Sequence, residues 1–324
     1  MKIVVLDGYA LNPGDLSWEG IKEMGDVEIY ERTSAAKILK RAEGAEVLLT
    51  NKTPLSRETI KALPELKYVG VLATGYNVVD IKAAAENNIV VTNVPTYGTN
   101  AVAQFVMALL LEVCHHVGEH NRAVKNGAWT EADDFCFWNY PLIELQDKTL
   151  GIIGFGSIGQ KTAELASAFG MKILSYDRSP EKKINNPEIK TEEIEFVDLM
   201  DLYRRADVIS LHCPQSKETE GMINKFSIAQ MKEGVIIINT SRGGLIVESD
   251  LAAALETGKV KTAAVDVLST EPPAASNSLL NSDRTIITPH IAWASQEARQ
   301  RLMNTVLENL KSFLEGNVIN QVNG

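Results

Sequence analysis

Residues 148–159 read KTLGIIGFGSIG, an apolar strand that runs into a glycine-rich turn and then into a helix. Gly154, Gly156 and Gly159 have the spacing G-x-G-x-x-G. In a dinucleotide-binding fold the first glycine permits a tight turn, the second lets the backbone approach a pyrophosphate, and the third packs helix on strand. The stretch therefore predicts a phosphate site at the N-terminus of the helix that starts near Ser157.

A carboxylate follows where such a site requires one. The next apolar run, residues 172–176, ends in Asp177, which lies 18 residues beyond Gly159. A carboxylate there accepts hydrogen bonds from a ribose 2′-OH and repels a 2′-phosphate, so the pattern predicts NAD and not NADP. Arg178 beside it could attract a 2′-phosphate, which leaves residual use of NADP open.

Short apolar runs alternate with helical patterns along the whole chain, which predicts an α/β fold with parallel sheets. The runs are residues 3–6, 27–30, 47–50, 68–72, 89–91, 149–153, 172–176, 208–211, 235–239, 262–267 and 285–288. No glycine fingerprint follows the first run, so the first series predicts a substrate domain and the second a doubly wound nucleotide domain. Between them a helix from Thr99 or Asn100 to about Val117 is apolar all round, which predicts burial between domains or against a second subunit.

Composition excludes several classes of protein. The net charge of the 324 residues is −10, and no cluster of Lys and Arg interleaved with aromatics indicates nucleic-acid binding. The three cysteines form no C-x-x-C pattern, so neither a disulfide framework nor a metal site is predicted. The first apolar run is too short for a signal peptide, and the longest, residues 101–113, is too short for a bilayer. We expect a soluble cytoplasmic protein without a membrane partner.

Three polar residues follow late runs or lie in adjacent loops: Arg242, Glu271 and His290. Because the carboxyl ends of parallel strands form the ligand crevice, we expect them to converge on the cofactor. A guanidinium grips a carboxylate, a histidine supplies a proton near neutral pH, and a neighbouring carboxylate favours the imidazolium form. Each residue alone could be a surface, loop or helix-entry residue, so only their joint occurrence indicates hydride transfer to a 2-oxo acid. The other histidines are predicted to be structural.

The chain resembles a known family, the D-isomer-specific 2-hydroxyacid dehydrogenases. The matching segments are residues 154–159 with Asp177, NTSRG at 239–243, AVDV at 264–267 followed by Glu271, and PHI at 289–291. The resemblance implies a Rossmann NAD-binding domain, residues 99–290, inserted into a flavodoxin-like substrate domain, residues 1–98 and 291–324. It also implies a homodimer joined through the nucleotide domain, which would explain the aromatic residues between Gly127 and Pro141.

The resemblance also implies roles for individual residues. Arg242 would bind and polarise the substrate, His290 would be the acid–base, and Glu271 its partner. Cofactor contacts are implied for Thr99, Gly154, Gly156, Ser157, Ile158, Gly159, Asp177, Cys213, Pro214, Thr219, Thr240, Ser241 and Asp266. Substrate contacts are implied for Thr74, Gly75, Tyr76, Asn77 and Trp293. Trp293 and Tyr76 could wall a small pocket or could simply be packing residues.

The loops at residues 74–77, 95–99 and 290–295 are most similar to those of the glycerate dehydrogenase (hydroxypyruvate reductase) branch of the family. That similarity implies NAD-dependent reduction of hydroxypyruvate to D-glycerate. A D-lactate or glyoxylate type of reductase remains an alternative within the family. A different class, NAD-sensing corepressor-like binding proteins, is disfavoured because the chain has no disordered tail or evident peptide-binding appendage.

Overall fold

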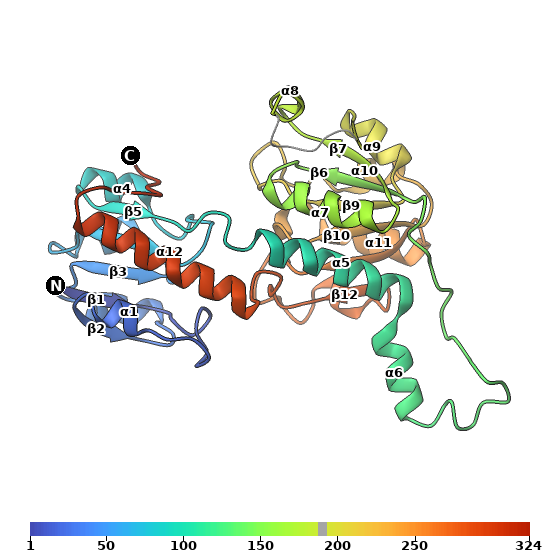
Figure 1. The fold of residues 1–324 in the computed structure, drawn as a ribbon, viewed down its shortest axis with the longest axis horizontal. Coiled ribbons are helices and arrows are strands. Elements are labelled where there is room, and N and C mark those ends of the chain that lie inside the picture. Colours follow the sequence, from blue (N-terminus) through green and yellow to red (C-terminus); the bar gives the residue numbers. More distant parts are fainter. Residues whose placement is uncertain (187–192) are drawn as a thin grey trace. The chain divides into compact units, whose positions relative to one another are not determined.

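The computed structural model describes residues 1–186 and 193–324. The chain forms two compact units, unit 1 with Met1–Gly98 and Trp293–Gly324, and unit 2 with Thr99–Ala292. Each unit contains one entirely parallel sheet with helices packed on it (Figure 1). The predicted α/β class with two doubly wound parallel-sheet domains is thereby confirmed.

Unit 1 is built on a five-stranded sheet in the order β2-β1-β3-β4-β5, which is the flavodoxin-like order. Its strands are β1 (Lys2–Val5), β2 (Asp26–Ile29), β3 (Val47–Thr50), β4 (Tyr68–Val71) and β5 (Val90–Thr92). Its helices are α1 (Glu19–Lys22), η1 (Ala35–Lys37), α2 (Ile38–Ala42), α3 (Arg57–Lys61), α4 (Ile81–Glu86) and α12 (Gln296–Leu314). Successive residues of β1 enter opposite apolar clusters: Ile3 and Val5 pack with α12, and Val4 packs with α2, α3 and α4. Burial on both faces explains why these strands are continuously apolar.

Unit 2 contains a seven-stranded sheet in the order β12-β11-β10-β9-β6-β7-β8. Its strands are β6 (Thr149–Ile153), β7 (Lys172–Tyr176), β8 (Ile194–Phe196), β9 (Val208–Leu211), β10 (Val235–Asn239), β11 (Val260–Val265) and β12 (Thr285–Ile287). Its helices are α5 (Thr99–His115), α6 (Val117–Lys125), α7 (Ser157–Ala168), α8 (Pro180–Ile184), α9 (Leu199–Arg205), α10 (Lys225–Gln230), η2 (Gly243–Leu245), α11 (Glu248–Thr257) and η3 (Ser278–Asn281). The order matches a Rossmann fold, and it reverses between β6 and β9, where such folds bind nucleotides. The sequence pattern missed β8.

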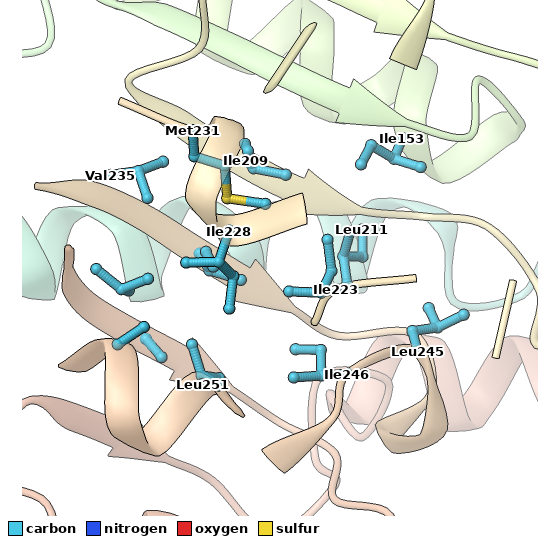
Figure 2. Packing of buried hydrophobic residues seen from close by; sticks show 14 of the residues in the cluster. Ile153, Ile209, Leu211, Ile223, Ile228, Met231, Val235, Leu245, Ile246 and Leu251 are labelled. Carbon is cyan, nitrogen blue, oxygen red and sulfur yellow. The ribbon is translucent and has the colours of Figure 1, made fainter. Parts of the chain in front are cut away.

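Two apolar layers cover the faces of this sheet. On one face Ile153, Ile209 and Leu211 pack with residues of α9, α10 and α11, and Figure 2 shows this cluster from close by. On the other face Ile152 packs with α5 and α7. The strand that carries the glycine turn is therefore held from both sides, which fixes the position of the turn.

The helix predicted to end at about Val117 is α5, which ends at His115, and a second helix that was not predicted, α6, follows it. His116 adopts a left-handed conformation with φ of 48°, and α6 starts after it at a bend of 55°. Glu112 stabilises the break, because its carboxylate accepts a hydrogen bond from the backbone N–H of Gly118 at 3.2 Å. Among the described residues no single helix is long and apolar enough to cross a membrane; the bent pair of α5 and α6 meets that test by length and composition.

Candidate active site

The glycine turn lies at the point where the strand order reverses, and each glycine has its own steric reason. Gly154 has φ of +99°, and a Cβ there would lie 2.7 Å from the backbone nitrogen of Cys213, just beyond β9. A Cβ on Gly159 would lie 2.3 Å from the carbonyl oxygen of Gly154. By contrast, a Cβ on Gly156 would meet no atom within 4 Å. The first and third glycines thus serve the turn itself, and the second borders open space.

That open space suits a dinucleotide phosphate. Gly156 is the N-cap residue of α7, and no side chain caps the helix. Ser157 and Ile158 form its first turn, whose N–H groups and positive dipole end favour an anion. Among the described residues, the buried hydroxyl of Thr240 has no hydrogen-bond partner, so a polar atom is left for a ligand. These observations fit a bound dinucleotide.

Asp177 follows β7 and lies next to the turn. Its Oδ2 accepts a hydrogen bond from the backbone N–H of Phe155 at 2.9 Å, and its Oδ1 accepts one from that of Ser179 at 2.9 Å. The carboxylate is therefore fixed beside the glycine turn while each oxygen retains a second lone pair. This placement is the one that recognition of a ribose 2′-OH requires.

The predicted cofactor residues after β9 form a self-contained loop. The hydroxyl of Thr219 donates to the carbonyl of Pro214 at 2.7 Å and accepts from the N–H of Ser216 at 2.8 Å. Cys213 is half-buried, and burial raises the pKa of its thiol. Thr219 closes the loop, while contacts of Cys213, Pro214 and Thr219 with a cofactor stay predictions.

The turn after β10 positions Arg242. Asn239, fully buried, accepts from the N–H of Ser241 at 3.0 Å and donates to the carbonyl of Arg242 at 2.8 Å. The hydroxyl of Ser241 donates to the carbonyl of Leu211 at 2.7 Å, which ties this turn to the end of β9. The Arg242 side chain is exposed at the carboxyl end of the sheet, where its guanidinium can reach a ligand.

Glu271 and His290 form a pair. Nδ1 of His290 lies 2.6 Å from Oε2 of Glu271, and since a carboxylate only accepts, Nδ1 carries the proton. The other carboxylate oxygen of Glu271 accepts from the N–H of Leu268 at 3.1 Å. Arg242, Glu271 and His290 thus follow β10, β11 and β12, three neighbouring strands. Gly243 brings two of their loops into contact, because a Cβ there would lie 1.9 Å from the carbonyl carbon of Leu268.

Asp266 holds the backbone around His290 in place through hydrogen bonds. It is 1% exposed, and its carboxylate accepts from the hydroxyl of Thr288 at 2.6 Å and from the N–H groups of Ile291 and Ala292 at 2.9 and 2.8 Å. Its carbonyl accepts from the N–H of His290 at 2.8 Å. His290 has a left-handed backbone with φ of 55°, a conformation that is unfavourable outside glycine unless its surroundings hold it. The sequence analysis assigned Asp266 to the cofactor and missed this support of His290, which only the fold reveals.

The remaining predicted residues lie elsewhere. Thr74, Gly75, Tyr76 and Asn77 follow β4 in unit 1, and the hydroxyl of Thr74 donates to the carbonyl of Val94 at 2.8 Å. Trp293, also in unit 1, packs edge to face against Tyr97 with ring centroids 6.3 Å apart. Thr99 is the first residue of α5 in unit 2. Their contacts with substrate or cofactor stay predictions. No group of three or more His, Cys, Asp or Glu side chains in the described ranges could hold a metal ion.

A Rossmann sheet with a glycine turn at its switch point and an Arg, Glu and His at the ends of three adjacent strands defines a nicotinamide-dependent oxidoreductase. The chain belongs to the D-isomer-specific 2-hydroxyacid dehydrogenase family, whose NAD-binding-domain model matches residues 107–292. A hydroxypyruvate reductase of Blautia hydrogenotrophica is 53% identical, with 100% of both chains covered. A glycerate dehydrogenase of Methylorubrum extorquens is 36% identical, covering 99% of this chain and 98% of the relative.

The solved structures agree with this assignment. An acyclic imino acid reductase in complex with NADPH and D-Arg is 30% identical and has a TM-score of 0.85, with 99% of this chain and 100% of that chain covered. The predictions of the family, of an NAD-dependent oxidoreductase and of a nicotinamide cofactor are therefore confirmed.

Proposed function

We propose that this protein interconverts hydroxypyruvate and D-glycerate, with NADH as the electron donor in the reductive direction. The observation that carries the proposal is the 2.6 Å pair of Glu271 and His290 beside the turn of Arg242. The identity of 53% over the full length to a hydroxypyruvate reductase supports the choice of substrate.

The chemistry assigns a task to each side chain. Arg242 binds the substrate carboxylate and polarises its carbonyl through forked N–H donors. A nicotinamide held in unit 2 would supply the hydride for the carbonyl carbon of the substrate. His290, whose Nδ1–H is held by Glu271, gives a proton from Nε2 to the carbonyl oxygen, and in the oxidative direction it takes that proton back. Glu271 accepts the Nδ1 hydrogen bond of His290 and fixes the orientation of the ring.

We propose that unit 2 is the NAD-binding domain and that unit 1 supplies the substrate loop at residues 74–77. In unit 2, Asp177 supports a preference for NADH. Arg178 is exposed next to it, so weak use of NADPH accompanies that preference. We also place the enzyme in the cytoplasm, since its three cysteines are free.

We further propose a homodimer joined through unit 2. The segment that leaves α6 runs out from the body of unit 2 as an extended loop (Figure 1). Its large apolar side chains are exposed: Trp129 by 52%, Phe135 by 89% and Trp138 by 65%. An apolar surface of this kind requires a partner, and a second copy of the chain supplies one with matching chemistry.

The test is an assay of NADH and NADPH oxidation with hydroxypyruvate, glyoxylate, pyruvate and phenylpyruvate. We expect the highest kcat/KM with hydroxypyruvate and NADH. His290→Gln and Arg242→Ala should each lower kcat/KM by about 10²- to 10⁴-fold. Arg204→Ala, which removes an exposed arginine of α9, is the matched control and should retain wild-type activity.

Other outcomes would redirect the proposal. A higher kcat/KM with pyruvate or glyoxylate would make the enzyme a D-lactate or glyoxylate type of reductase. Near-normal turnover by His290→Gln would refute the acid–base assignment. No turnover with any of the four acids, together with NADH-dependent binding of a protein partner, would favour the corepressor class instead.

A further inference from the structure

The loop that carries Glu271 has little to hold it in place. Residues 269–276 are all exposed, so no buried side chain anchors this part of the connection between β11 and η3. Yet Oε2 of Glu271 must stay 2.6 Å from Nδ1 of His290 for the pair to act. A carboxylate on an exposed loop keeps such a geometry only if the two ends of the loop are fixed.

Glu248 fixes both ends. Its Oε1 accepts a hydrogen bond from the backbone N–H of Ser269 at 2.6 Å, two residues before Glu271. Its Oε2 accepts one from Nδ2 of Asn277 at 2.7 Å, six residues after Glu271. One carboxylate therefore bridges the start and the end of the exposed loop with two charge-assisted hydrogen bonds.

Glu248 is itself well placed to act as an anchor. It is the first residue of α11, a helix that is fixed by the buried side chains of Leu251 and Leu255. Glu248 lies in the first turn of this helix, where the positive end of the helix dipole attracts a negatively charged side chain. The anchor is thus part of the rigid layer that covers the sheet.

We propose that Glu248 is a positioning residue, which clamps the loop of Glu271 and through it holds His290 ready to donate its proton. This inference rests on the proposed function of the Glu271–His290 pair. Charged groups of unit 2 that contact the His290 segment include Glu271, through the ring, and Asp266, through the backbone and Thr288. Of these two, only Glu271 depends on the clamp.

The clamp has a signature that a purely structural contribution lacks. When Glu248 is removed, Glu271 is held less firmly against the ring, so the ring is oriented less well for proton transfer. The loss of kcat should therefore depend on the presence of Glu271. A purely structural contribution of Glu248 would lower stability and activity equally with and without Glu271.

The experiment is a double-mutant cycle on the full-length enzyme. We expect Glu248→Ala to lower kcat for hydroxypyruvate about tenfold, with the KM for hydroxypyruvate changed by less than about twofold. The Kd of NADH should stay within about twofold of the wild type, since the clamp lies away from the phosphate turn. In a Glu271→Ala background, Glu248→Ala should change kcat by less than about twofold, because the group it positions is gone.

Matched variants distinguish the loss of the clamp from a general loss of folding or stability. Glu248→Gln keeps an oxygen for Ser269 and should fall between the wild type and Glu248→Ala. Asn277→Ala releases the other end of the loop without a substitution in α11. This variant replaces Glu248→Ala in the test if Glu248→Ala does not fold. Glu256→Ala removes an exposed acid of the same helix and should leave kcat unchanged.

Two results would overturn the inference while leaving the proposed function intact. One is an equal loss of kcat on Glu248→Ala with and without Glu271, and the other is a wild-type kcat for Glu248→Ala. A wild-type enzyme without activity on any 2-oxo acid would instead reject the proposed function.

Discussion

At the scale of single residues, two histidines of unit 2 have opposite environments. The side chain of His290 is 28% exposed and bonded to a carboxylate, which suits a group that exchanges protons. The ring of His212 donates to or accepts from Ser210 at 2.8 Å, and its buried Nδ1 has no partner among the described residues. Burial lowers the pKa of His212 to about 4, so this ring stays neutral in the folded protein at neutral pH.

This difference makes His212 a source of acid sensitivity. In the unfolded chain a histidine is protonated as the pH falls below about 6.5, whereas folded His212 is protonated only near pH 4. The contribution of neutral His212 to folding stability is therefore complete above pH 6.5 and is lost as the pH falls toward 4. His212→Asn should reduce the loss in free energy of unfolding between pH 7 and pH 4.5 by about 2 kcal/mol. Urea unfolding of the wild type and of His212→Asn at the two pH values measures this loss in free energy of unfolding. Equal losses would show that His212 is not responsible.

Single residues also mark the limit of what the sequence could predict. Arg242, Glu271 and His290 were predictable because each stands directly after an apolar run or in the loop that follows one, and the ends of parallel strands meet at one edge. Glu248 was not, because its two partners lie 21 and 29 residues away and it belongs to an unremarkable amphipathic helix. The support of His290 by Asp266 was missed for the same reason, since side-chain acceptors of distant N–H groups leave no periodic signal.

At the scale of elements, substitutions in the glycine turn between β6 and α7 can test whether this turn binds the pyrophosphate. Gly156→Ala should leave the stability of the cofactor-free protein unchanged or raise it by up to about 1 kcal/mol, because φ is −76° and nothing lies within 4 Å of the new methyl group. The same methyl group should weaken NADH binding by about tenfold or more, since it occupies the approach of the pyrophosphate.

Gly159, in the same glycine turn, provides the control substitution for Gly156→Ala. Gly159→Ala places a methyl group 2.3 Å from the carbonyl of Gly154 and should lower stability by about 1 to 3 kcal/mol. Thermal unfolding without NADH and calorimetric titration with NADH separate the two effects. If Gly156→Ala bound NADH as well as the wild type, the phosphate would not lie at this turn.

Elements whose periodicity is strong were predictable from sequence, and the exceptions have physical reasons. β6, β7, β9 and β10 were placed correctly because burial on both faces demands uninterrupted apolar runs. The second helix, α6, was not predicted; the backbone bends at His116, where Glu112 supplies an acceptor for the N–H of Gly118 at the start of that helix. The edge strand β8 reads IEF, so an acidic residue interrupts its apolar residues and no continuous apolar run marks it.

At the scale of the whole molecule, the exposed aromatic loop after α6 has few contacts with its own unit. Nε1 of Trp129 donates to the carbonyl of Phe135 within the loop, Tyr140 stacks on His116 with ring centroids 4.3 Å apart, and the N–H of Asn139 donates to His120 at 3.2 Å. These contacts shape the loop but leave its largest apolar side chains in solvent. Sequence reasoning identified the need for a partner surface from composition alone, but it could not show which side chains stay uncovered.

The proposed dimer predicts the mass of the protein in solution and the substitutions that should separate the two subunits. Light scattering after size exclusion should give the wild type twice the 35.5 kDa of one chain. The double variant Phe135→Ser and Trp138→Ser should elute as a monomer, because it removes two side chains that are 89% and 65% exposed in the isolated chain. Phe226→Ser, at an equally exposed phenylalanine of α10, should keep the wild-type mass. A wild type that is monomeric at micromolar concentration, or a double variant that stays dimeric, would show that the aromatic loop is not the subunit interface.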